Sequence, residues 1–133
     1  MFELLWIAGA LFLGMHGVIH LMGFFTYWPL AVTPDLVYKT TILAGQIELG
    51  SVGMRVYSIL WLIPALGFLA TSFAMFRNWH RWQPVLLVMA VISFIVTALD
   101  WSVVFRGTLI DFTILVVFLV AFQSPKLIPV RGR

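Results

Sequence analysis

Two histidines in an otherwise apolar segment are the residues of this sequence best suited to chemistry. His16 and His20 lie four residues apart within the stretch LGMHGVIHLMGF. Residues at i and i+4 of a helix share one face, with Cβ atoms about 5–6 Å apart, so both imidazoles can reach one small ion or one proton. A bare HxxxH pattern, with no glutamate after the first histidine, lacks the zinc-protease signature. The pair therefore points to ion or ligand binding, or to helix packing.

A third segment supplies the polar residues expected to complete this site. Ser93, Thr97 and Asp100 follow the spacing i, i+4, i+7 and share one helix face. At 1.5 Å per residue, Asp100 falls at about the depth of His20. His16, His20 and Asp100 would then form a two-histidine, one-carboxylate set of the kind that holds a divalent metal ion. We expect one polar cavity that opens outward and binds an ion, a proton or a small polar ligand.

Two other roles fit the same residues. Each imidazole can hydrogen-bond a backbone carbonyl or Asp100 and so hold helices together in a purely structural subunit. Alternatively, His20 and Asp100 can act as an acid–base pair in an enzyme whose substrate dissolves in lipid, such as a quinone or isoprenoid. Haem is disfavoured, because two histidines on one helix face cannot take opposite axial positions on one iron.

Four more charged residues are predicted to gather just beyond the histidines, as gating residues or ion pairs: Glu48, Arg55, Arg106 and Asp111. Arg55 or Arg106 is the expected partner of Asp100, since ion pairing is the usual fate of charges near a membrane interface. Thr108-Leu109-Ile110-Asp111 resembles a capping box, so Asp111 is expected in the first turn of a helix.

The composition requires a membrane to position these residues. Of the 133 residues, 62% are hydrophobic and 10% are charged, with a mean hydropathy of +1.07. Soluble domains average about 45–50% apolar and about 25% charged residues. The chain has no cysteine, which excludes disulfides, iron–sulfur clusters and c-type haem attachment. Nothing in the sequence indicates nucleic-acid binding, and the expected environment is the lipid bilayer.

Hydropathy predicts a single all-α membrane domain over residues 1–133. The four expected spans are about 4–27, 54–76, 84–105 and 108–123, each a helix because backbone groups in lipid must be paired within the segment. The loop 29–53 contains two β-favouring runs, KTTIL and QIEL, around Ala44-Gly45. These runs predict a short β-hairpin that covers the outer end of the bundle.

The charge distribution predicts an orientation. With four spans, both termini and the loop 77–83 share one side of the membrane. That side carries five basic residues against Glu3: Arg77, Arg81, Lys126, Arg131 and Arg133. The positive-inside rule then places both termini in the cytoplasm and the hairpin loop outside it.

The segments HGVIHLMGF, YKTTIL, GMRVYSILWL and TALDWSVVFRG together resemble a family of small bacterial four-helix integral membrane proteins. The resemblance spans nearly the whole chain. It implies the four-span fold and a bacterial plasma membrane, but no activity. Because one chain of this size makes a thin bundle, we expect a homo-oligomer or an accessory subunit of a larger complex, with Gly14 and Gly17 as a candidate contact face.

Overall fold

The structure is a computed structural model that describes residues 2–33, 36–79 and 81–123. The described residues form four helices and a two-stranded hairpin: α1 (Phe2–Tyr27), β1 (Thr41–Ile42), β2 (Ile47–Glu48), α2 (Gly50–Phe76), α3 (Trp82–Leu99) and α4 (Trp101–Gln123). Each helix is long and apolar enough to cross a membrane. The prediction of an all-α four-span fold with a short hairpin is confirmed. Residue 80 and residues 124–133, with three of the five basic residues used for the orientation, lie outside the described residues.

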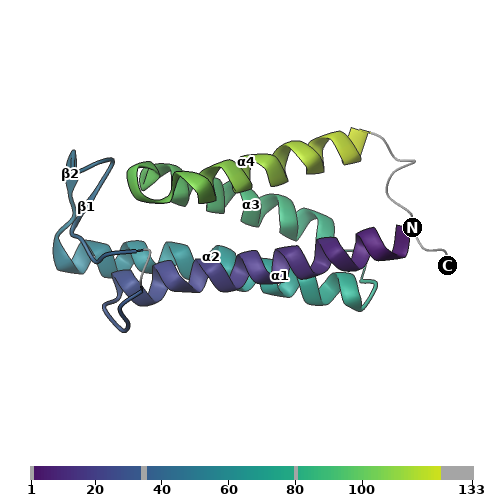
Figure 1. Ribbon diagram of the computed structural model, residues 1–133, viewed down its shortest axis with the longest axis horizontal. Coiled ribbons are helices and arrows are strands. Elements are labelled where there is room, and N and C mark those ends of the chain that lie inside the picture. Colours follow the sequence, from purple (N-terminus) through teal and green to yellow (C-terminus); the bar gives the residue numbers. More distant parts are fainter. Residues whose placement is uncertain (1, 34–35, 80, 124–133) are drawn as a thin grey trace.

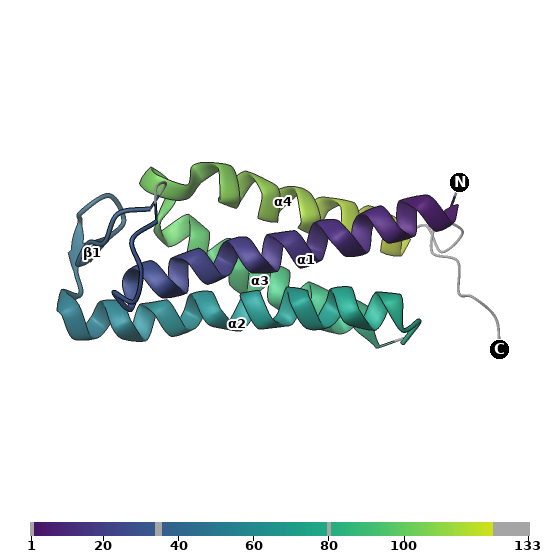
Figure 2. The same ribbon diagram turned by 60° about the horizontal axis from the view of Figure 1, so that its bottom comes forward.

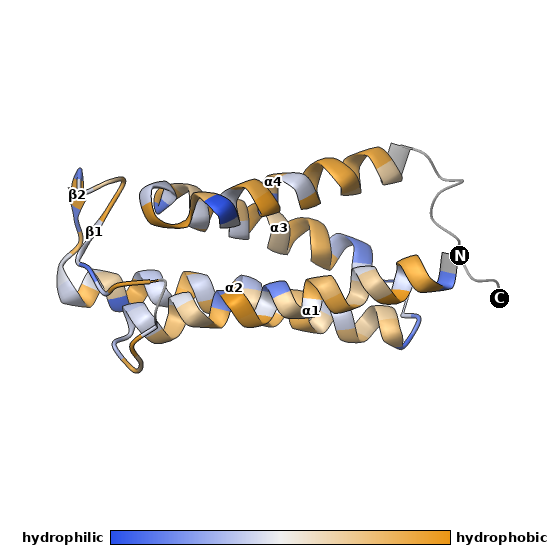
Figure 3. Ribbon diagram, viewed as in Figure 1, coloured by the Kyte–Doolittle hydropathy of each residue, from blue (hydrophilic) through white to orange (hydrophobic). Residues whose placement is uncertain are grey.

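The helices pack as two antiparallel pairs. Figures 1 and 2 show α1 beside α2 and α3 beside α4, with the hairpin at one end of the bundle. The first turn of α1, the α2–α3 turn and the last turn of α4 lie at the opposite end. Figure 3 shows hydrophobic residues along most of each helix and hydrophilic ones concentrated near the helix ends, with a few inside the bundle. Tight turns join α2 to α3 and α3 to α4, whereas the longer segment 28–49, which includes the hairpin, joins α1 to α2.

The hairpin forms where the sequence predicts it. Thr41 pairs with Glu48 and Ile42 with Ile47 in an antiparallel register. The turn between them is closed by hydrogen bonds from Gly45 N–H to Ile42 C=O and from Gln46 N–H to Leu43 C=O, both 3.1 Å. Gly45 has φ +89°, a conformation in which a glycine avoids strain. The hairpin rests on the bundle through Ile42, which is buried, and through a bond from Leu43 N–H to Leu99 C=O at 2.8 Å.

The junction between the last two helices differs from the sequence-based expectation. The predicted break at Arg106-Gly107 lies inside α4, and the chain instead turns at Asp100. There, Asp100 C=O accepts hydrogen bonds from the N–H groups of Val103 and Val104, and Val104 has the non-helical angles φ −116°, ψ 31°. The turn forms at Asp100 because Tyr27 and Lys39 both bond its buried carboxylate. The capping box predicted at 108–111 therefore does not begin a helix.

The interior of the bundle has three parts along its length. An apolar cluster fills the part nearer the α2–α3 turn: Ala10, Leu13, Phe68, Met75, Leu86, Ala90 and Ile114. A second cluster, richer in aromatic residues, fills the part beneath the hairpin: Tyr27, Leu36, Ile42, Met54, Tyr57, Trp61 and Val96. Between these clusters lie buried polar side chains from α1, α3 and α4. Any group that reaches this middle layer along the bundle must pass one of the two clusters.

Two glycines of α1 set how closely α2 approaches it. A Cβ at Gly17 would lie 2.8 Å from the carbonyl oxygen of Ala65, and a Cβ at Gly23 would lie 2.2 Å from the Trp61 ring. Both positions therefore allow contact that a side chain would prevent. Gly17 is used within the chain, against α2, so the predicted contact face for a second copy is in part already occupied. A shallow apolar groove beside Gly14 remains on the outside of α1 and α2.

Candidate metal centre

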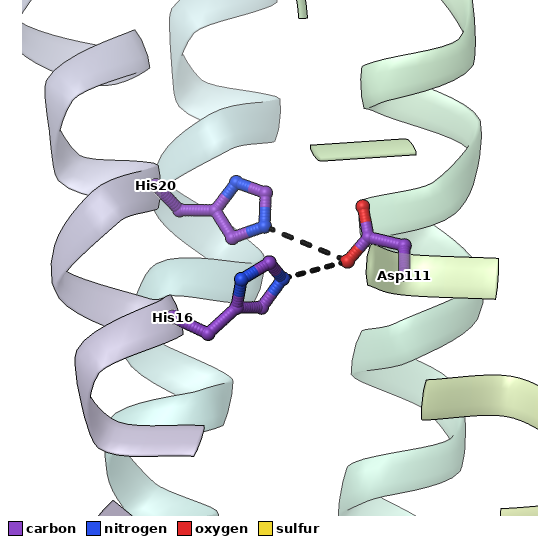
Figure 4. A group of neighbouring side chains, drawn as sticks. All are labelled: His16, His20 and Asp111. Carbon is purple, nitrogen blue, oxygen red and sulfur yellow. Dashed lines mark hydrogen bonds and ion pairs between the residues drawn. The ribbon is translucent and has the colours of Figure 1, made fainter. Parts of the chain in front are cut away.

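The middle polar layer brings His16 and His20 of α1 together with Asp111 of α4. One ligand atom from each of the three residues can be chosen so that all lie within 4.8 Å of one another. Nε2 of His16 lies 2.7 Å and Nε2 of His20 lies 3.9 Å from Oδ1 of Asp111. Figure 4 shows both imidazoles directed toward the same carboxylate oxygen. All three side chains are buried.

The buried face of α1 explains why the histidines point toward Asp111. Ala10, Leu13, Gly17 and Gly23 are inward-facing positions of the same helix as the histidines, at the three- and four-residue steps of a helix face. The histidines therefore project toward the other three helices rather than toward lipid. On α4, buried residues recur at Thr108, Asp111 and Ile114, which directs the carboxylate inward.

Two hydroxyls of α3 complete the hydrogen bonding of the carboxylate. Ser93 Oγ donates to Oδ1 of Asp111 at 2.7 Å, and Thr97 Oγ1 donates to Oδ2 at 2.9 Å. Because a carboxylate only accepts, Nε2 of His16 donates to Oδ1. Ser93 has a single hydroxyl proton, already given to Asp111, so its oxygen accepts from Nε2–H of His20 at 2.6 Å. The cluster thus links α1, α3 and α4 through side chains alone.

Aromatic rings enclose the imidazoles on the sides that do not face Asp111. Phe68 of α2 lies 4.9 Å from His16 and 5.8 Å from His20, measured between ring centroids. Trp61, also of α2, lies 5.4 Å from His20. Such walls separate the imidazoles from bulk solvent and lower the local dielectric, so charges or ions inside interact strongly with the ligand atoms. The expected polar cavity is, in the described residues, a closely packed cluster.

Asp100, which the sequence grouped with the histidines, lies elsewhere. Its buried carboxylate accepts a hydrogen bond from the Tyr27 hydroxyl and forms an ion pair with Lys39, whose side chain is 21% exposed. This second polar group closes the hairpin end of the bundle, and Tyr27 belongs to both this group and the aromatic cluster. Asp111 takes the place beside His16 and His20 that was expected for Asp100.

The other predicted gating residues do not gather into one group. Arg55 and Arg106 are exposed, and within the described residues neither forms an ion pair with Asp100. The guanidinium of Arg106 lies 5.8 Å from the ring centroid of Phe105. Glu48 accepts a hydrogen bond from Gly50 N–H at 3.0 Å, beside the start of α2. The cation that pairs with Asp100 is Lys39, which sequence reasoning did not single out.

The arrangement does not match that of a nucleophilic hydrolase. Ser93 and His20 are within hydrogen-bond distance, as a nucleophile and its base would be. In such a site, however, a carboxylate orients the imidazole through its second nitrogen. Here Asp111 lies on the Nε2 side of His20 and bonds the serine itself. The predicted acid–base pair of His20 and Asp100 is also not formed, since the two side chains have different partners.

No family model, curated protein or solved structure matches this chain in the comparisons made. The chemistry of the site is therefore inferred from its geometry.

Proposed function

We propose that this chain is an integral membrane protein that binds one divalent transition-metal ion in the middle of its helix bundle. The observation that carries the proposal is the convergence of His16, His20 and Asp111 within 4.8 Å in an otherwise apolar interior. Two imidazole nitrogens and a carboxylate oxygen suit zinc, iron, cobalt or manganese, whereas magnesium and calcium favour sites built from oxygen alone. Ionisable residues within spans are costly to bury and mark functional sites.

Small movements would bring the three atoms to coordinating positions. In a tetrahedral site with bonds of about 2.1 Å, two ligand atoms lie about 3.4 Å apart. The distance from His16 Nε2 to Asp111 Oδ1 is 2.7 Å and that from His20 Nε2 is 3.9 Å. One distance must therefore lengthen and the other shorten by about half an ångström or a little more. Ser93 Oγ, within hydrogen-bond distance of His20 and Asp111, is the candidate for the fourth ligand.

Metal binding to purified protein tests this function. The detergent-solubilised protein, stripped with chelator, is titrated with Co²⁺, whose visible spectrum reports coordination, and then with Zn²⁺ in competition. We expect one ion per chain, and at least a 100-fold loss of affinity in Asp111→Asn. Glu48→Gln is the control and should bind like wild type, because it neutralises a carboxylate outside the cluster and its amide oxygen can still accept from Gly50 N–H.

The opposite result favours a structural role. Asp111 already accepts hydrogen bonds from His16, Ser93 and Thr97, so the cluster is well bonded without an ion. A chain that takes up no stoichiometric Co²⁺ or Zn²⁺, or an Asp111→Asn variant that binds as tightly as wild type, would reject the metal site. The cluster would then serve to hold α1, α3 and α4 together.

We further propose that the protein lies in a bacterial plasma membrane with both termini in the cytoplasm, as a homo-oligomer or as a subunit of a larger complex. Five basic residues near the termini and in the loop 77–83 support this orientation. Single cysteines introduced into the hairpin and at position 78 test it, since the native chain has none. A membrane-impermeant maleimide applied to intact cells should label the hairpin site only; labelling at position 78 instead would reverse the orientation.

A further inference from the structure

Two buried nitrogens beside the metal centre have no hydrogen-bond partner among the described residues. They are Nδ1 of His20 and Nε1 of Trp61, and the Tyr57 hydroxyl lies near enough to the indole to be a competing acceptor. Figure 4 shows Nδ1 of His20 on the side of the ring that points away from Asp111 and His16. Buried polar groups nearly always find a partner, because leaving one unpaired costs about 1–3 kcal/mol. Because the two rings are neighbours, one bound group could pair both nitrogens.

The two nitrogens are chemically complementary. Trp61 Nε1–H is only a donor. Since Nε2 of His20 carries a proton that it gives to Ser93, Nδ1 of the neutral ring is an acceptor. The ring centroids lie 5.4 Å apart at 57°, and the two nitrogens do not bond each other. A molecule that accepts from Trp61 and donates to His20 would pair both atoms.

The position of Trp61 is fixed by its neighbours. Its ring packs over Gly23, where a Cβ would lie 2.2 Å from Cε3, and it contacts Tyr27 at 6.0 Å between centroids. Because Gly23 and Tyr27 follow His20 along α1, the indole lies on the side of His20 that faces away from His16. This is also the direction in which Nδ1 points.

We propose that His20 Nδ1 and Trp61 Nε1 together bind one small hydroxylic molecule, a water, as a second site next to the metal centre. Its size follows from hydrogen-bond geometry: one oxygen that bonds both nitrogens would hold them about 4.5–5 Å apart at usual hydrogen-bond lengths. Buried waters of this kind bond two to four polar groups that the protein leaves unpaired.

The consequence for metal binding rests on the proposed function. When a metal takes Nε2 of His20, the ring proton moves to Nδ1, and ligand histidines almost always donate that proton to a second group. The same oxygen can then accept from both Nδ1–H and Trp61 Nε1–H. Trp61 thus acts as a positioning residue that holds the oxygen, and through it the imidazole, without touching the metal.

Nuclear magnetic resonance on ¹⁵N-labelled, metal-free protein in micelles tests the water site. We expect the Trp61 indole proton to show a cross-peak to a long-lived water, and the His20 ring to carry its proton on Nε2. Trp6 gives an internal reference, since its Nε1–H donates to Met75 C=O at 3.1 Å and should show no such cross-peak. Tyr57 is the competing acceptor, because its ring lies 6.4 Å from that of Trp61 and its own proton is given to Val96 C=O.

The variants separate the possible outcomes. A water cross-peak that persists in Tyr57→Phe supports the proposal. An indole signal that lacks the cross-peak overturns it, as does a cross-peak lost in Tyr57→Phe, which would assign the contact to the tyrosine. Trp61→Phe keeps the ring packing and should lower Co²⁺ affinity 10–100-fold, while Trp6→Phe changes it less than threefold. A protein that binds no Co²⁺ but shows the cross-peak rejects the metal function and leaves the water site standing.

Discussion

Nε2 of His16 donates to Oδ1 of Asp111 at 2.7 Å, although the two residues are 95 positions apart in the chain. A second contact between the same parts of the molecule joins Tyr27 to Asp100. The number of residues between His16 and Tyr27 equals the number between Asp100 and Asp111. The chain runs toward the hairpin end in the first segment and away from it in the second. These two contacts therefore fix the antiparallel register of α1 against α4 and place the carboxylate at the depth of the histidines.

We expect Asp111→Ala to destabilise the bundle by about 2 kcal/mol, because it removes the acceptor of His16 and Ser93 and leaves Thr97 with backbone carbonyls of α3 alone. Hydrogen bonds between membrane helices average about 0.6 kcal/mol each and reach about 1.7 kcal/mol. Reversible unfolding in mixed micelles measures the change. Thr113→Ala, which removes a bond from Thr113 Oγ1 to Leu109 C=O within α4, is the control and should cost less than about 0.5 kcal/mol. Equal stability of Asp111→Ala and wild type would show that the cluster contributes nothing to folding.

A thiol at position 93 should strengthen metal binding. Ser93 Oγ lies 2.7 Å from Oδ1 of Asp111, so Ser93→Cys would offer a thiolate as fourth ligand. We expect at least a tenfold gain in Zn²⁺ affinity and a thiolate-to-Co²⁺ charge-transfer band in the near ultraviolet. Ser58→Cys places a buried thiol on α2, outside the cluster, and should show neither effect. The proposal fails if the two variants behave alike.

The pair of Lys39 and Asp100 should contribute to stability at the hairpin end. Lys39→Met leaves a buried carboxylate whose remaining side-chain donor is Tyr27, so we expect a loss of about 1–3 kcal/mol, less than for a fully buried pair because Lys39 is 21% exposed. Arg55→Met is the control and should lie within about 0.5 kcal/mol of wild type.

A double variant distinguishes this pairing from a general effect on the loop. Lys39→Met with Asp100→Asn removes both charges and should recover part of the loss, since no uncompensated carboxylate remains. If the double variant is less stable than the sum of the single changes predicts, the ion pair is not the cause.

Gly17→Ala should separate α1 from α2. The added methyl would lie 2.8 Å from Ala65 C=O, a backbone atom that cannot move aside. We expect a loss of about 1–3 kcal/mol, although alanine favours helix over glycine by about 1 kcal/mol. At Gly9 the nearest heavy atom, Met75 Cε, is 3.9 Å away, so Gly9→Ala should be neutral or stabilising. Unfolding midpoints of the two variants measure the difference, and a stable Gly17→Ala would contradict the close packing.

Hydropathy and turn chemistry were sufficient to predict the spans and the hairpin. Apolar runs of the length of α1 and α2 have few alternatives to a membrane helix, and Ala44-Gly45 lies in the turn between the strands. The pair His16 and His20 was also recognised correctly as facing inward, because a helix face can be read from spacing.

The carboxylate beside the two histidines, Asp111, could not be predicted, because its position depends on where the third helix ends. Sequence reasoning began the fourth helix at Thr108, so Asp111 fell in its first turn. The helical segment begins at Trp101 and is kinked at Val104, so Asp111 lies about two turns beyond the kink rather than in a first turn. Asp100 moves to the turn, where Tyr27 and Lys39 bond it. Tyr27 lies on the same face of α1 as His20 and Gly23. This was the one feature of the sequence from which a partner for Asp100 near the end of α1 could have been predicted.

The separation of His16 from Asp111 along the chain also has a consequence during biosynthesis. The ribosome makes α1 first, and at about 5–20 residues per second the carboxylate follows it by about 5–20 s. During that interval His16 lacks its acceptor on α4, and His20 gains its partner Ser93 only once α3 has been made. Completion of the buried cluster is therefore the last step of assembly, and a chain that stops before α4 would leave His16 inside the membrane without its acceptor.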